Sequence, residues 1–273
     1  MSININLHFS AKTKNLNLTT MKTTRISLFV FILIFTVRWT IAQENLATQL
    51  LLIHEDNVIV GKASQYAKAS TDLVKLLTES NFQDMTYSAF WVEDYTYMYV
   101  SPIENMAQLD DIPWAKLSQQ VGKDKTEAVF AEFNGTYNTH RDFIAIFHPD
   151  LSYKSEQLQE EGYNYREWNY MYYNEIHQDQ MMNLAKEWKK LYEDKNVSNG
   201  YTIYTNGFGH EGPVLVIHTW ATNPVDHAQK NQKRQELLGE EAQKLWERTA
   251  ALTYRIETKT GWLMSDMSYM PQE

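Results

Sequence analysis

The spacing of hydrophobic and polar residues in the C-terminal part of the chain predicts strands and helices in a defined order. The aromatic run Tyr165 to Glu175 is typical of a strand, and apolar residues recur at helical spacing after Asp179, a plausible N-cap. Asn223 followed by Pro224 is typical of a helix start. The predicted elements are a strand at 165–175, a helix at 179–193, strands at 201–206 and 214–220, a helix from 223 to about 252 with a break near Gly239, and strand at 254–257 and 261–264.

The N-terminal part repeats this order with weaker signals. Its predicted elements are a strand at 49–54, a helix at 64–79, strands at 85–91 and 95–100, helical pieces within 105–133 that are interrupted at Pro113 and near Gly122, and a strand at 143–147. Both series follow the order β-α-β-β-α-β, which is the ferredoxin-like arrangement. The polar segment 154–164 between them is predicted to be a linker.

A near-repetition in the sequence supports two copies of one unit. Asp150-Leu-Ser-Tyr recurs as Asp266-Met-Ser-Tyr, at an offset of 266 − 150 = 116 residues. A ferredoxin-like unit has helices on one face of its sheet, so the other face must be covered. We therefore predict an α+β fold in which two tandem ferredoxin-like units, residues 45–153 and 165–271, pack sheet to sheet as a pseudo-dimeric α/β barrel.

Several short motifs carry a resemblance to a known superfamily. They are His54-Glu55-Asp56 with Val60-Gly61-Lys62, the run Tyr97 to Ile103, Gly261-Trp262 and the two Asp-x-Ser-Tyr endings. With these motifs the chain resembles a tandem dimeric α/β-barrel protein, of the superfamily that includes NIPSNAP-like proteins and antibiotic-biosynthesis-type monooxygenases. The resemblance covers most of residues 47–271. It implies the barrel fold and leaves the reaction open, because the superfamily includes haem-degrading enzymes, cofactorless oxygenases, dismutases and proteins of no known activity.

The N-terminal residues have the layout of a secretory signal peptide that runs from Met21 to Ala42. Lys22 and Arg25 precede an apolar run at 26–37, and Thr40 and Ala42 provide small residues at positions −3 and −1 of a cleavage site after Ala42. This pattern predicts a periplasmic or secreted protein, and the Ala-Gln junction resembles signal peptides of Bacteroidetes. An uncleaved interfacial anchor is the alternative, and residues 1–20 would be an extension. The apolar run is too short to span a membrane after or before cleavage.

Composition narrows the classes of partner. The chain has 25 Lys+Arg and 34 Asp+Glu, and residues 1–42 contain five of the basic residues and no acidic one. The predicted mature charge is therefore 20 − 34 = −14, which disfavours binding to nucleic acids and anionic membranes. The absence of cysteine excludes disulfides. Because both predicted barrel halves lie in one chain, we expect a monomer.

Aromatic residues at alternate positions of the strands predict a ligand cavity. If these faces point into the barrel, they would line a cavity suited to a small apolar or aromatic ligand; if they point to the helices, they are ordinary core. The sequence does not decide between the two faces. The candidate ligand-binding residues are Trp91, Tyr97, Tyr99, Trp168, Tyr170, His218 and Trp220.

Two histidines are candidates for chemistry. His54 ends the first predicted strand beside two acidic residues, and His218 shares a strand face with Trp220; either could act as an acid or base or bind haem iron. No metal-binding spacing is present, so we predict neither a metal nor a cofactor of its own. Without a Gly-x-Ser-x-Gly motif, the Asp-x-Ser-Tyr endings are predicted to be structural corners.

Three functions remain open at this point. The leading hypothesis is an exported protein that binds a small molecule in an aromatic-lined barrel cavity. The alternative is a cofactorless or haem-linked oxygenase that uses His54 or His218. A third is a structural or assembly role without a ligand.

Overall fold

The computed structural model describes residues 48–272, so the predicted extension and signal peptide lie outside the described residues. Its strands and main helices are β1 (Gln49–Val58), α2 (Ala63–Glu79), β2 (Ser88–Val92), β3 (Thr96–Ile103), α3 (Pro113–Val121), α4 (Lys123–Ala131), β4 (Tyr137–Phe147), β5 (Tyr165–Tyr173), α5 (Gln178–Asp194), β6 (Thr202–Asn206), β7 (Val214–Ala221), α6 (Pro224–Leu252) and β8 (Thr253–Leu263). None of the helices in this part of the chain is both long enough and apolar enough to cross a membrane.

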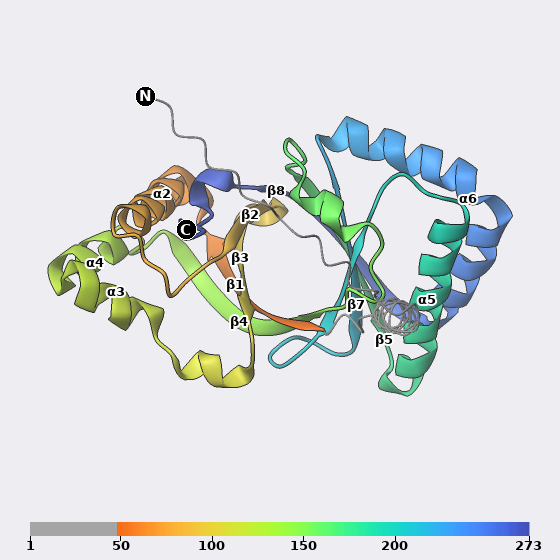
Figure 1. Ribbon diagram of the computed structural model, residues 1–273, viewed down its shortest axis with the longest axis horizontal. Helices are drawn as coiled ribbons and strands as arrows, with labels where there is room; N and C mark the ends of the chain where they lie inside the picture. The colour runs from red at the N-terminus through yellow and green to blue at the C-terminus, as the bar shows by residue number, and fades with distance from the viewer. Residues whose placement is uncertain (1–47, 273) are drawn as a thin grey trace, which may run out of the picture. The chain divides into compact units, whose positions relative to one another are not determined.

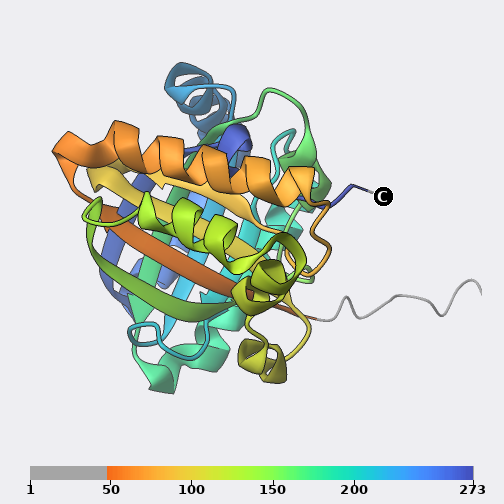
Figure 2. The same ribbon diagram turned by 90° about the vertical axis from the view of Figure 1, so that its left-hand side faces the viewer.

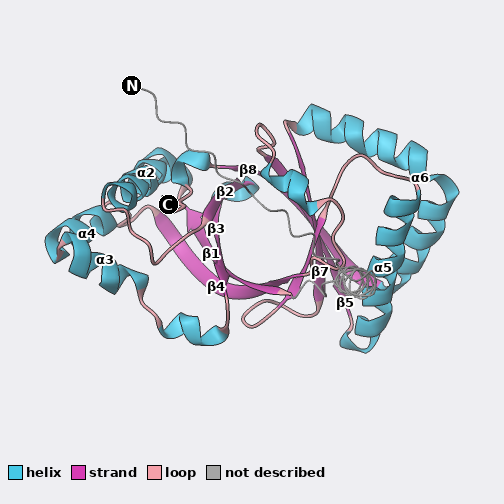
Figure 3. Cartoon of the chain, in the orientation of Figure 1, coloured by secondary structure: helices cyan, strands magenta, loops and turns pink. Residues whose placement is uncertain are grey.

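The eight strands form one closed antiparallel barrel in the order β1-β3-β2-β8-β5-β7-β6-β4. The first half (β1 to β4) and the second half (β5 to β8) each follow the order β-α-β-β-α-β. The halves meet where β2 pairs with β8 and where β4 pairs with β6. The helices of each half cover the outside of its own strands (Figure 1, Figure 3). Figure 2 shows α2 and α4 side by side over the first-half strands. The fold is therefore α+β, with a closed barrel as predicted.

Several strands carry apolar residues both on the outer face, which the helices cover, and on the inner face. On β5 and β7, Trp168 and Tyr170 lie with Val214 and Val216 in a cluster inside the barrel. The alternate residue Leu215 belongs to the core beneath α5 and α6. Side chains alternate between faces along a strand, so each strand supplies both cores.

Local signals at the helix ends agree with the structure, with one exception. The Asn223 side chain accepts a hydrogen bond from the Asp226 amide at 3.0 Å, and Pro224 is the first residue of α6. The predicted break in α6 lies at Gly239, which has φ +56°. The prediction that Asp179 is an N-cap is wrong, since α5 begins at Gln178. Asp179 lies instead in the first turn, where its charge suits the helix dipole.

The two Asp-x-Ser-Tyr corners tie each half to the other. Ser152 accepts a hydrogen bond from the Ile203 amide at 3.0 Å, and Ser268 accepts one from the Ala89 amide at 2.9 Å. Each serine hydroxyl also donates to a carbonyl four residues earlier in the chain. The adjoining tyrosines extend these contacts by pairing Tyr153 with Tyr201 and Tyr269 with Tyr87. The structural reading of these motifs is confirmed.

Strand pairing shows which residues of the two halves correspond. His54 pairs with Tyr99 in β3 and with Asp142 in β4. At the same place in the second half, Asn169 pairs with Ile217 and Thr258. The offset is therefore 169 − 54 = 115 in β1 and β5, 217 − 99 = 118 in β3 and β7, and 258 − 142 = 116 in β4 and β8.

A single offset of 116 does not align the two halves. It would match His218 with Pro102, whereas the strand register matches His218 with Val100. The loop between β6 and β7 is longer than the turn between β2 and β3, which shifts the offset within each half.

Candidate functional site: a cavity beneath the second-half helices

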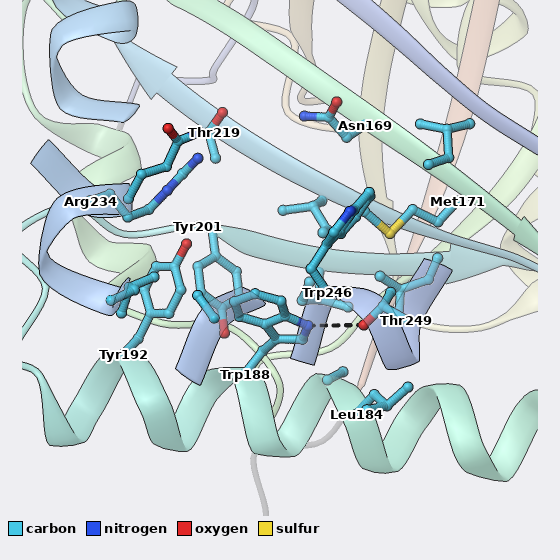
Figure 4. Close-up of a pocket in the computed structure, with 18 of the residues that line it drawn as sticks. Asn169, Met171, Leu184, Trp188, Tyr192, Tyr201, Thr219, Arg234, Trp246 and Thr249 are labelled. Carbon is cyan, nitrogen blue, oxygen red and sulfur yellow. Dashed lines mark hydrogen bonds between the residues drawn. The ribbon is translucent and has the colours of Figure 1, made fainter. Parts of the chain in front are cut away.

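A cavity of about 650 Å³ lies between the outer face of the second-half strands and helices α5 and α6. Figure 4 shows side chains from both layers that point into it. Its apolar lining residues are Met171, Met181, Leu184, Ala185, Trp188, Ile203, Leu215, Ile217, Leu238, Ala242, Trp246 and Ile256. The volume lies within the range of small-molecule sites.

At three positions around the cavity the second half has smaller side chains than the first. The register matches Tyr97 with Leu215 and Tyr99 with Ile217. Helices α2 and α5 both have 17 residues, so Tyr66 corresponds to Met181. In the first half the three tyrosine rings fill the space between sheet and helix, with Tyr66 and Tyr97 centroids 4.7 Å apart.

One end of the cavity carries polar groups. The hydroxyl of Tyr201 is buried and has no hydrogen-bond partner in the described residues. Arg234 of α6 lines the cavity and makes no ion pair with any acid of residues 48–272. Burial raises the pKa of Tyr192, and the nearby positive charge of Arg234 opposes this shift. Figure 4 shows Arg234 and Tyr192 at the same end. A buried tyrosine hydroxyl and an unpaired guanidinium are both available to a ligand.

Several other polar side chains around the cavity are hydrogen-bonded within the protein. Trp188 donates its indole N–H to Thr249 Oγ1 at 3.1 Å, as the dashed line in Figure 4 marks. Asn169 donates to Glu167 at 2.9 Å and accepts from Thr258 at 2.8 Å. These bonds fix parts of the cavity wall, and Arg234 and the Tyr201 hydroxyl remain to contact a ligand.

The barrel interior, where the sequence predicted the site, contains a second cavity of about 510 Å³. Trp168, Tyr170 and His218 line it, as predicted. Trp220 lies on the same strand face, with its ring 5.8 Å from that of His218.

The prediction that Trp91, Tyr97 and Tyr99 line the barrel interior is wrong. Tyr97 and Trp91 belong to the core under α2, and Tyr99 packs there as well, with its hydroxyl 2.9 Å from Ser70 Oγ. Their alternate neighbours Met98 and Val100 face the interior instead. Both faces of β3 are buried, so alternation alone does not reveal which face carries the aromatic residues.

The two candidate histidines lie in opposite environments. His54 is on the outside of the barrel, with Nδ1 2.8 Å from Asp142 and Nε2 3.2 Å from Asp56. Burial alone would lower the pKa of His54, but the two carboxylates outweigh it and raise the pKa to about 9. His218 is enclosed in the barrel, where burial and the charge of Arg166 hold its pKa well below the usual 6.5. The structure does not bring the two histidines together.

Neither position forms a metal site. Across residues 48–272, no group of three His, Asp or Glu side chains has the arrangement of a metal centre. No histidine lines the second-half cavity, so a haem with a histidine ligand does not fit there.

Neither a known family model nor a curated protein matches this sequence. Solved structures do match the fold. An anthrone oxidase-like protein superposes with a TM-score of 0.53 at 11% identity, covering 82% of this chain and 93% of that chain. A candidate monooxygenase from Lactobacillus acidophilus gives 0.50 at 10% identity over 82% of this chain and 97% of that one. Another candidate monooxygenase, from Fusobacterium nucleatum, superposes with a TM-score of 0.51 at 10% identity, covering 81% of this chain and 94% of that chain.

These similarities establish the fold alone. The chain has the dimeric α/β-barrel fold that the sequence motifs indicated. Sequence reasoning missed the second-half cavity and Arg234. The available signal was the replacement of first-half tyrosines by Met181, Leu215 and Ile217, which becomes visible only in the correct register.

Proposed function

We propose that the protein binds a small amphipathic molecule, with an aromatic body and an acidic or hydrogen-bonding group, in the second-half cavity. The observation that carries this proposal is a cavity with large apolar walls that is also lined by Arg234, which makes no ion pair, and by the buried, unpartnered Tyr201 hydroxyl. A buried polar group without a partner costs stability, which a ligand would restore. The signal-peptide pattern supports a location outside the cytoplasm. In this proposal the protein has no cofactor of its own.

The walls define which ligands would fit. Trp188 and Trp246 come from α5 and α6 and offer flat apolar surfaces, against which an aromatic body would pack. Arg234 would bind an acidic group by a charge-assisted hydrogen bond. The apolar lining contributes affinity, and the polar end sets the orientation of the ligand.

The experiment compares two probes of similar shape. The sulfonate 8-anilinonaphthalene-1-sulfonate carries a charge, and N-phenyl-1-naphthylamine does not. We expect the folded protein to bind both probes. Arg234→Gln should lower the affinity for the sulfonate at least tenfold and change the affinity for the uncharged probe by no more than twofold. Met181→Tyr, which introduces the first-half side chain, should weaken both probes. Unchanged affinities in both variants would overturn the proposal and would favour a structural role without a ligand.

The second candidate is an oxygenase without a cofactor in the same cavity. The fold neighbours described as anthrone oxidase-like and as candidate monooxygenases favour it. Arg234 is placed to stabilise the anion of a phenolic substrate. Neither His54, outside the barrel, nor His218, inside it, reaches this cavity. Oxygen consumption with an anthrone as substrate tests this candidate: uptake that disappears in Arg234→Gln supports it, and no uptake leaves binding alone.

We also propose that the two halves are tandem ferredoxin-like units of one repeated element and that the protein is a monomer. The repeated element order and the closed barrel within one chain support this. Light scattering at the mass of a single mature chain is the expected result. Twice that mass would contradict it.

A further inference from the structure

The barrel interior holds a buried positive charge without a counter-ion. Arg166 of β5 is 2% exposed. One of its terminal nitrogens donates to the backbone carbonyls of Tyr163 and Tyr165, and Nε has no partner. No carboxylate of the described residues pairs with it. Burial lowers the pKa of Arg166 to about 10, so the side chain stays charged at neutral pH.

The buried carboxylate of Glu55 on the inner face has a counter-ion, in contrast to Arg166. Glu55 accepts a hydrogen bond from Arg141 Nε at 2.6 Å, so its charge is compensated. A buried cation is normally paired in this way, because removing a charge from water is costly. The unpaired charge of Arg166 therefore lowers the stability of the folded protein, and no ion pair within the described residues offsets this loss.

A second unpartnered group lies beside Arg166. His218 is 3% exposed and lines the interior cavity, and its Nε2 has no hydrogen-bond partner. Its Nδ1 is held by Thr202 Oγ1 at 3.1 Å. The imidazole stacks on Trp168 with ring centroids 5.2 Å apart and an interplanar angle of 7°. The orientation of the free nitrogen is thus fixed by its neighbours.

The surrounding wall is aromatic. Phe90 meets Trp168 edge to face, with ring centroids 5.6 Å apart, and the Arg166 guanidinium carbon lies 6.0 Å from the Phe90 centroid. Both rings line the interior cavity of about 510 Å³. The cavity therefore has a free imidazole nitrogen and flat apolar walls, and the Arg166 guanidinium is buried next to its Phe90 wall.

We propose that this end of the barrel interior, formed by Arg166, His218 and Trp168, is a binding site for a planar aromatic carboxylate. The carboxylate would accept hydrogen bonds from Arg166 Nε and, in the tautomer that carries a proton on Nε2, from His218. The aromatic ring would pack against Phe90 and Trp168. This site is separate from the cavity beneath α5 and α6 and does not depend on the function proposed for it.

The test uses benzoate and the uncharged benzamide as probes in calorimetry on the full protein. We expect benzoate to bind at least tenfold more tightly than benzamide, and to raise the melting temperature. Arg166→Met should remove this preference. His218→Ala should lower the affinity for benzoate and leave folding intact. Because Arg234 could bind benzoate in the other cavity, Arg166→Met and His218→Ala are also compared in the Arg234→Gln background. Arg248→Gln, at an exposed surface position, serves as the control and should bind benzoate as the wild type does.

Stability separates a binding role from a structural one. If Arg166 serves a ligand, Arg166→Met should raise the melting temperature of the ligand-free protein, because a buried unpaired charge is removed. If Arg166→Met does not fold, the comparison of benzoate with benzamide on the wild-type protein still tests whether the site prefers a carboxylate. Equal affinity for the two probes, or wild-type benzoate binding in His218→Ala and Arg166→Met, would overturn the proposal.

Discussion

The two halves of the barrel place the same elements around their sheets and differ in what fills the space beneath the helices. In the first half, Tyr66 donates to Asp56 at 2.5 Å and accepts from Tyr99 at 3.0 Å, inside a closely packed aromatic core. In the second half, Met181 and Ile217 occupy the positions of Tyr66 and Tyr99, and a cavity of about 650 Å³ remains. The same order of elements thus encloses a packed core in one half and a candidate binding site in the other.

The difference shows how the two halves divide stability and function. A filled, hydrogen-bonded core contributes packing and satisfied polar groups. A hollow core forfeits contacts along its lining, so it costs stability unless a ligand occupies it. We therefore expect the first half to be the stable part of the barrel and the second half to tolerate substitution, and the experiments below test this contrast.

The largest effect is expected from exchanging the residues at the position shared by Tyr66 and Met181. Tyr66→Met should lower the free energy of unfolding by about 3 kcal/mol, because a fully buried ring is lost and Asp56 loses its donor. Met181→Tyr should change it by less than about 1 kcal/mol, since the cavity has room for the ring. Urea denaturation of both variants measures the contrast, and equal losses in the two halves would contradict it.

A smaller effect is expected at the position shared by Ser70 and Ala185. Ser70 is buried and hydrogen-bonded to Tyr99, whereas Ala185 lines the cavity. Ser70→Leu should destabilise by about 2 kcal/mol through overpacking. Ala185→Leu should be neutral or stabilising by up to about 1 kcal/mol, and should weaken the naphthylamine probe. Thermal unfolding with and without the probe checks both outcomes, and a large loss in Ala185→Leu would argue against an accessible cavity.

Sequence reasoning succeeded where the signal is local. The cap at Asn223 and the break at Gly239 are determined by one or two residues, and both are present in the structure. The alternation of Tyr97 and Tyr99 with Met98 and Val100 was also visible. The sequence did not show which of these two sets faces the barrel interior, because β3 is buried on both faces and either orientation fits the pattern.

The cavity could not be predicted because it depends on a comparison in register. The constant offset of 116 aligned outward-facing His54 with inward-facing Tyr170, and it set Tyr99 against Leu215 instead of Ile217. A shift of one residue reverses every side chain of a strand. Unpaired groups such as Arg166 Nε are likewise visible only when every neighbour is placed.

The smallest effect concerns pH and the position shared by His54 and Asn169. His54 has a folded-state pKa of about 9 against the ordinary 6.5, so its contribution is fully present below pH 6.5 and is lost as pH rises through 9. The side chain is 37% exposed, and solvent screening limits the contribution to about 1 kcal/mol. His54→Gln should therefore be less stable than wild type at pH 7 and equal to it at pH 10, as urea denaturation would measure. Asn169→Ala, at a position that does not titrate, should show the same difference at both pH values; a pH-independent loss in His54→Gln would mean that the ion pairs with Asp56 and Asp142 contribute nothing.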